Sequence, residues 1–146
     1  MILISHRGNI EGANPDFENN PEYIYNALRL GYNVEIDVWY KEGKLKLGHD
    51  EPQYDFPFEL FKNWSDKLWL HCKNIEALQK LNREDRIGVH MNYFWHDIDY
   101  AVLTSKGYIW SINPVENGIL VMPEHTNSIL LEKTIGICSD NIKRYG

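Results

Sequence analysis

The sequence predicts an α/β fold, in which about seven to eight mostly parallel strands are joined by short crossover segments. Three observations favour it. Short apolar runs recur along the chain, segments with helical spacing separate several of them, and two of the early runs end in a histidine. The 146 residues are enough for a single domain with a substantial core, and residues 1–146 contain no linker, repeat or low-complexity tract.

The first part of the chain alternates strand, helix and strand. An apolar strand is expected at 2–6, followed by a loop at 8–21 that is rich in Gly, Asn and Pro. Pro21 suits the first turn of a helix, and Gly31 suits the C-terminal end of that helix. A second, longer strand is expected at 32–40.

The remaining elements are shorter. A tight turn at 41–44 leads into the run 45–48, which returns His49 towards the preceding strand. A third strand is expected at 68–73, and a segment with helical spacing follows it. We expect further elements as follows: a short helix or turn at 56–64, strands within 86–95 and at 108–112, 119–122 and 134–139, a short helix at 127–133 and a closing turn at 142–145.

The composition argues against several classes of protein. The formal net charge of −6 does not favour a nucleic-acid backbone or an anionic membrane as partner. No signal peptide and no apolar run of membrane-spanning length is visible, so we expect a cytoplasmic protein without a membrane span. Cys72 and Cys138 each lie in a strand-like run, and we expect small buried side chains there rather than a disulfide. The sequence leaves the oligomeric state open.

Two acids on the second strand are the first candidate site. Side chains on a strand alternate between its faces, so Glu35 and Asp37 share one face and the intervening Ile36 points to the other. Burying two carboxylates side by side is costly because like charges repel and desolvation penalises both. A divalent cation held by oxygen ligands would resolve this cost. The alternative is a solvated strand face with two unremarkable acids.

Four short motifs surround this strand in a particular order. They are His6-Arg7-Gly8, Glu18-Asn19, Glu35-x-Asp37 and Gly48-His49-Asp50. Their order and spacing over residues 2–50 resemble the glycerophosphodiester phosphodiesterase family, within the phosphatidylinositol-specific phospholipase C-like barrels. The resemblance implies a reduced TIM-like (β/α) barrel with shortened or missing helices, because a complete barrel usually needs at least about 200 residues.

The resemblance also implies a chemistry. It makes His6 and His49 the catalytic acid–base pair and Glu35 and Asp37 the ligands of a divalent metal, with Mg²⁺ or Ca²⁺ expected. Arg7 would bind the substrate phosphate, as its forked guanidinium allows. The function implied is metal-dependent hydrolysis of a small, soluble phosphodiester resembling a glycerophosphodiester.

The third strand departs from the family's pattern. The family places a third acidic metal ligand two residues before a lysine, and here that position is His71 in His71-Cys72-Lys73. Either His71 is a metal ligand, which would widen the choice of ion to Mn²⁺ or Zn²⁺, or it contacts phosphate. Lys73 shares its strand face and would contact phosphate in both cases.

Three further residues are secondary candidates. Glu18 is either a metal ligand or an acceptor that fixes its loop, and we favour the second. Asp50 would orient His49, and His96 is expected at the mouth of the fourth strand.

Two other functions compete with hydrolysis. One is a phospholipase D-like lyase, as in spider sphingomyelinases, which share the histidine and acid arrangement. The other is a non-catalytic barrel that binds a phosphorylated ligand, which the altered third ligand and the short chain favour.

Overall fold

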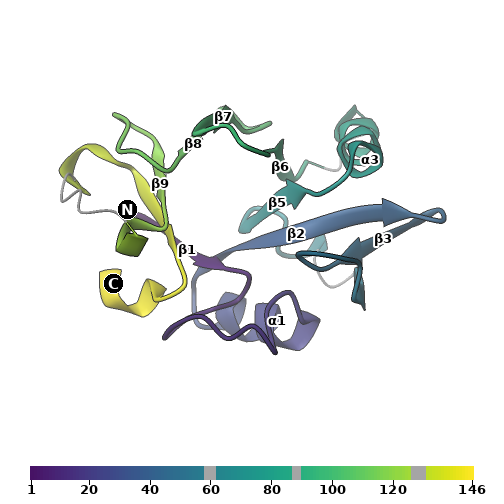
Figure 1. The fold of residues 1–146 in the computed structure, drawn as a ribbon, viewed down its shortest axis with the longest axis horizontal. Helices are drawn as coiled ribbons and strands as arrows, with labels where there is room; N and C mark the ends of the chain where they lie inside the picture. The colour runs from purple at the N-terminus through teal and green to yellow at the C-terminus, as the bar shows by residue number, and fades with distance from the viewer. Residues whose placement is uncertain (58–61, 87–89, 126–130) are drawn as a thin grey trace.

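The structure is a computed structural model that describes residues 1–57, 62–86, 90–125 and 131–146. Within these ranges one curled sheet of ten strands forms the centre of the molecule, and two α-helices, α1 (Pro21–Arg29) and α3 (Ile75–Arg86), lie on its outer side (Figure 1). The strands are β1 (Ile2–His6), β2 (Asn33–Lys41), β3 (Lys44–Leu47), β4 (Tyr54–Asp55), β5 (Leu68–Cys72), β6 (Asn92–Trp95), β7 (Ala101–Leu103), β8 (Ile109–Ser111), β9 (Ile119–Val121) and β10 (Gly136–Ser139).

The smaller predicted helices are only partly covered by the structure. Residues 58–61 of the segment 56–64 and residues 127–130 of the segment 127–133 lie outside the described ranges. Single 3-10 turns occur at Pro123–His125, Leu131–Lys133 and Ile142–Tyr145, the last of which is the closing turn expected from the sequence.

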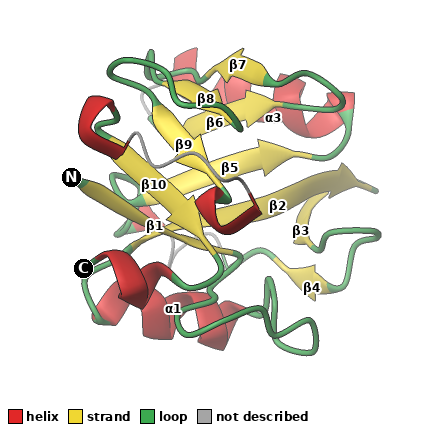
Figure 2. Ribbon diagram, turned by 60° about the vertical axis from the view of Figure 1, so that its left-hand side comes forward, coloured by secondary structure: helices red, strands yellow, loops and turns green. Residues whose placement is uncertain are grey.

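The sheet combines a parallel centre with antiparallel additions. Parallel ladders join the strands in the order β6-β5-β2-β1-β10-β9-β8 (Figure 2). β3 pairs antiparallel with the C-terminal part of β2, β4 with β3, and β7 with β8. In the ranges that the structure covers, no ladder joins β6 to β7, so the curl stays open there as a half-barrel.

The prediction of a reduced TIM-like (β/α) barrel is therefore wrong. Such a barrel needs parallel strands alternating with helices, and the described residues contain a mixed, open sheet with two α-helices. The connections explain the difference: a crossover with its helix takes a dozen or more residues, and residues 112–118 between β8 and β9 are too few. Sequence patterns also missed β4 and β7, which pair antiparallel and do not continue the parallel series.

The two faces of β2 pack against different cores. Val34, Ile36 and Val38 are fully buried in one apolar cluster, together with residues of α1 and α3. The opposite face looks into the curl, where a second cluster contains Trp69, Trp110 and four other buried residues of the strands. Glu35 and Asp37 lie on that inner face and are 2% and 0% exposed. The alternative of a solvated strand face is therefore wrong.

Both cysteines are free and buried, as the sequence predicts. Burial raises the pKa of the Cys72 thiol to about 12 and that of Cys138 well above its usual value, so neither is an available nucleophile. Among the helices of the described residues, none combines the length and apolar character needed to cross a bilayer.

Candidate functional site

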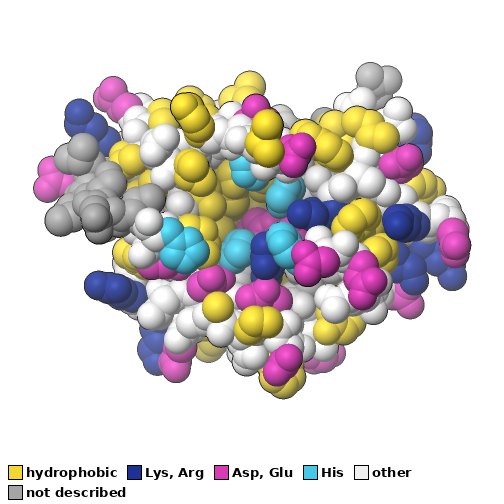
Figure 3. Space-filling model, viewed as in Figure 1, with side chains coloured by type: hydrophobic (Ala, Val, Ile, Leu, Met, Phe, Trp, Pro, Cys, Tyr) yellow, Lys and Arg dark blue, Asp and Glu magenta, His cyan; other side chains and the backbone are white. Residues whose placement is uncertain are grey.

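The registers of the parallel strands bring the candidate residues together. His6, the last residue of β1, is the register partner of Glu35 on β2. Asp37 is in turn the partner of His71 on β5. Figure 3 shows histidine and acidic side chains gathered around a hollow in the middle of this face of the molecule. Three neighbouring strands therefore place four chemically active side chains side by side.

Asp37 is the most heavily contacted of these residues. Its Oδ2 accepts a hydrogen bond from Asn19 Nδ2 at 2.9 Å, and it lies 3.0 Å from Arg7 Nε and 3.5 Å from His49 Nδ1. Burial opposes its ionisation, but the contacts of His49 and His71 and the charge of Arg7 hold the pKa of Asp37 well below its ordinary value. These contacts therefore favour the ionised form of Asp37 inside the curl.

Glu35 has the opposite electrostatic character. Burial and the neighbouring charge of Asp37 raise the pKa of Glu35, although the charges of His6 and His71 oppose this increase.

Two carboxylate oxygens of this pair, Oε2 of Glu35 and Oδ1 of Asp37, accept no hydrogen bond. Two buried carboxylate oxygens without a hydrogen-bond donor are groups whose burial a divalent cation would compensate. Glu35, Asp37 and His71 offer three ligand atoms that lie within 4.8 Å of one another.

His6 is held by a partner that the sequence analysis missed. Its Nδ1 donates to Oδ1 of Asp140, the residue that follows β10, at 2.7 Å, so Nε2 is left facing the cleft, 3.7 Å from Glu35. Burial opposes protonation of the ring, but the hydrogen bond to Asp140 and the charge of Glu35 outweigh it and raise the pKa of His6. Asn9, which is fully buried, donates to the same Asp140 oxygen at 2.7 Å and fixes the carboxylate.

His49 is the more accessible of the two predicted catalytic histidines. Its side chain is 42% exposed, with Nδ1 beside Asp37 and Nε2 3.4 Å from Arg7 Nη2, which can donate to it. The expected orienting contact from Asp50 is weak, because Asp50 is 94% exposed and its Oδ1 lies 3.6 Å from His49 Nε2. Arg7 and Asp37 are the less exposed charged neighbours of His49, and Asp50 is the solvent-exposed one.

The remaining predicted residues take different places. Both carboxylate oxygens of Glu18 accept hydrogen bonds, from Arg7 at 3.1 Å and from Asn9 at 2.9 Å, which suits the loop-fixing role better than that of a metal ligand. Lys73 lines the cleft beside His71 and makes no ion pair within the residues that the structure describes. His96 also lines the cleft, and burial and the nearby His71 lower its pKa, which keeps the ring neutral.

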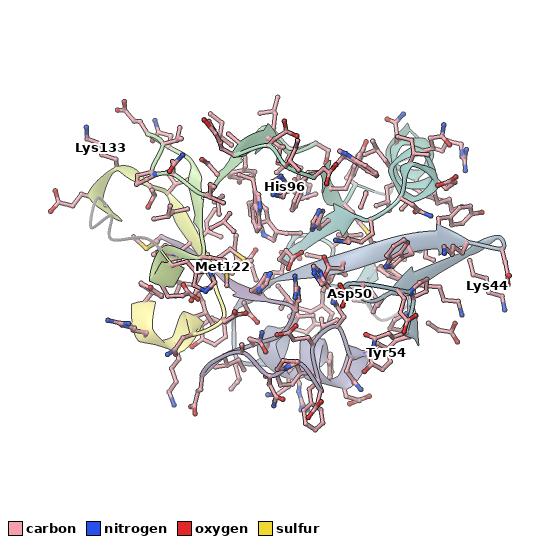
Figure 4. The ribbon with its side chains drawn as sticks, viewed as in Figure 1. Lys44, Asp50, Tyr54, His96, Met122 and Lys133 are labelled. Carbon is pink, nitrogen blue, oxygen red and sulfur yellow. The ribbon has the colours of Figure 1, made fainter. Side chains whose placement is uncertain are left out.

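The cleft has two lobes that meet at the histidines. One lobe of about 370 Å³ contains Glu35, His71 and Lys73 and has an apolar wall that includes Trp110. The other, of about 540 Å³, includes Glu18 and Asp140. His6, Arg7, His49 and Met122 belong to both lobes. In Figure 4, His96, Met122 and Asp50 surround the middle of the curl, whereas Lys44 and Lys133 lie at its periphery.

A substitution at Gly48, the residue before His49, tests how tightly the loop that carries His49 is packed. Gly48 has a φ of +155°, its nitrogen donates to the Asp37 carbonyl and its own carbonyl accepts from Trp39 Nε1 at 2.6 Å. A Cβ added at Gly48 would overlap the carbonyl oxygen of Glu51, so the loop carrying His49 would have to move.

We expect Gly48→Ala to lower the melting temperature and any cleft-dependent activity together. The matched control is Gly43→Ala, at a φ of +75° where an added Cβ meets nothing within 4 Å. The control should cost only the roughly 1 kcal/mol of a left-handed residue. Thermal unfolding of both variants measures the difference, and equal losses would show that the Glu51 contact does not constrain the loop.

Comparison of the chain with protein-family models, with curated proteins and with solved structures gives no match.

Proposed function

We propose that this protein hydrolyses a small phosphodiester in a metal-dependent reaction, with His6 and His49 as its acid–base pair. One observation carries the proposal. Two histidines that line a shared cleft flank a buried Glu35–Asp37–His71 group that retains two carboxylate oxygens without hydrogen-bond donors. A phosphodiester needs its charge neutralised, a base for the attacking oxygen and an acid for the leaving oxygen, and this cleft offers candidates for each role.

The donor set fits a divalent cation. Glu35 and Asp37 supply two carboxylates and His71 a third ligand atom, and these three atoms lie within 4.8 Å of one another. A bound cation would neutralise charge on the phosphate oxygens as a Lewis acid. Two cations of the protein, Arg7 and Lys73, line the cleft and would attract the substrate phosphate. Lys73 makes no ion pair among the described residues, whereas Arg7 already pairs with Glu18 and Asp37.

The proton transfers fall to the histidines. Asp140 holds the hydrogen on Nδ1 of His6, which leaves Nε2 as the atom that can take or give a proton in the cleft. His49, held between Arg7 and Asp37, supplies the second proton-transfer group. One histidine takes the proton of the attacking oxygen, either water or a neighbouring hydroxyl of the substrate, and the other protonates the leaving oxygen.

A turnover assay tests the proposal. The purified protein is incubated with bis(p-nitrophenyl) phosphate and with a panel of glycerophosphodiesters, in Mg²⁺, Ca²⁺, Mn²⁺, Zn²⁺ or EDTA. We expect turnover with at least one ion and none in EDTA. Phosphorus NMR of the final products separates the two reactions. A linear monoester indicates hydrolysis, whether water attacks directly or opens a cyclic intermediate, and a cyclic phosphate that is not hydrolysed further indicates the lyase alternative. Binding of phosphate esters without turnover in any ion would favour the non-catalytic alternative instead.

A further inference from the structure

The ring of His71 is held so that a particular nitrogen faces the buried acids. Nε2 lies 3.0 Å from the backbone carbonyl oxygen of His96. A carbonyl only accepts hydrogen bonds, so Nε2 must carry the hydrogen. The ring also stacks on Phe94, with centroids 5.3 Å apart and planes 8° from parallel, which fixes its orientation. In the neutral ring, the lone pair is therefore on Nδ1.

That nitrogen points at the acids. His71 Nδ1 lies 3.2 Å from Asp37 Oδ1 and 3.8 Å from Glu35 Oε1. Ligand atoms bound about 2 Å from one ion stand on the order of 3 Å apart, so small side-chain shifts suffice. A metal-binding histidine usually donates its other N–H to a carbonyl or carboxylate, and the His96 carbonyl provides that partner.

The same geometry argues against a phosphate contact for His71. Nε2 is already bonded to the His96 carbonyl, and an anion at Nδ1 would meet the carboxylate oxygens of Asp37 and Glu35. Lys73, two residues along the same strand face, makes no ion pair among the described residues. Its ammonium group can therefore bind a phosphate in the cleft.

We propose that His71 is a metal ligand through Nδ1, oriented by the His96 carbonyl, and that it shifts the site from Mg²⁺ and Ca²⁺ towards Mn²⁺ and Zn²⁺. Imidazole suits Zn²⁺ and other first-row transition metals, whereas Mg²⁺ and Ca²⁺ prefer carboxylate, carbonyl and water oxygens. Mn²⁺ shares their preference for carboxylates but belongs to the first-row series, so a mixed set of two carboxylates and one imidazole suits it better than Mg²⁺ or Ca²⁺. With two carboxylates and a neutral imidazole, a divalent ion gives a site of zero net charge, and Lys73 remains for the substrate phosphate. The inference rests on the metal site of the proposed function.

Calorimetric titration tests the selectivity. We expect the ratio of the Mg²⁺ to the Mn²⁺ dissociation constant to fall about tenfold or more in His71→Asp, which replaces the imidazole with a third carboxylate. The matched control is His96→Ala, which removes a cleft imidazole but keeps the backbone carbonyl that His71 uses. Its ratio should stay close to that of the parent, and a fall in the control but not in His71→Asp would assign the selectivity to His96.

A spectroscopic measurement on the parent protein avoids the question of whether a variant folds. Electron spin echo on the Mn²⁺-loaded parent detects a directly bound nitrogen, and we expect one imidazole signal. Mn²⁺ binding without a nitrogen signal would overturn the inference while leaving the Glu35–Asp37 site standing. If neither Mn²⁺ nor Mg²⁺ binds the parent, both the inference and the metal dependence of the proposed function are wrong.

Discussion

If the proposed phosphodiester hydrolysis is right, we expect replacement of His6 with glutamine to lower turnover by roughly 10²- to 10⁴-fold, the usual effect of losing a general acid or base. Glutamine keeps polarity and a hydrogen-bond donor near Asp140, but it cannot exchange a proton at neutral pH. The measurement is kcat for the parent and the variant in the activating ion, with the melting temperature as the check on folding. His49→Gln should show a loss in the same range.

The control for this prediction is His90→Gln. His90 is exposed and precedes β6, at the opposite end of the strand from the cleft. It should retain parental turnover. A His6→Gln protein that folds normally and keeps more than about a tenth of the activity would remove His6 from the mechanism.

Asp140 is a positioning residue, and its role can be separated from a structural one. Asp140→Asn should lower kcat because the neutral side chain accepts more weakly from His6 Nδ1. If Asp140 acts through His6, the same substitution should have little further effect in the His6→Gln background. Independent, multiplicative losses would instead show that Asp140 supports the fold around Asn9.

The residues of the site were more predictable than the fold. The alternation of Val34, Glu35, Ile36 and Asp37 places the acids on one face in any strand, so this part of the prediction did not depend on the architecture. The position of His6 at the end of a predicted strand likewise identified it as a candidate site residue. Asp140 lies 134 residues further along the chain, and its contact with His6 depends on the pairing of β1 with β10, which local patterns do not reveal. It does follow a predicted strand, so the strand-end criterion could have found it.

The architecture depends on connections rather than on the strands themselves. Apolar runs at 108–112, 119–122 and 134–139 correctly indicated strands β8, β9 and β10. The segment 99–106 lacks a clear alternation, and it forms the antiparallel β7 only because β8 offers an edge. Such pairings depend on tertiary context, which explains why a mixed half-barrel was not foreseen.

The proposed metal site predicts how a bound ion changes the melting temperature of the parent and of variants in its two acids. At about a hundred times its dissociation constant, a bound ion stabilises the parent by about 2.7 kcal/mol, or roughly 5–10 °C in melting temperature for a chain of this size. Glu35→Gln and Asp37→Asn should each lose most of that shift. The exposed Glu116→Gln should keep it.

Without metal, the same two variants should move in opposite directions. Asp37 is ionised and contacts Arg7, His49 and His71, so Asp37→Asn breaks a buried ion pair and should destabilise the protein by about 3 kcal/mol. Glu35 is a desolvated acid whose pKa is raised beside Asp37, so Glu35→Gln should leave the melting temperature unchanged or raise it. Thermal unfolding in EDTA and in each ion gives both comparisons. A parent that no ion stabilises, or a Glu35→Gln protein that responds as fully as the parent, would contradict the site.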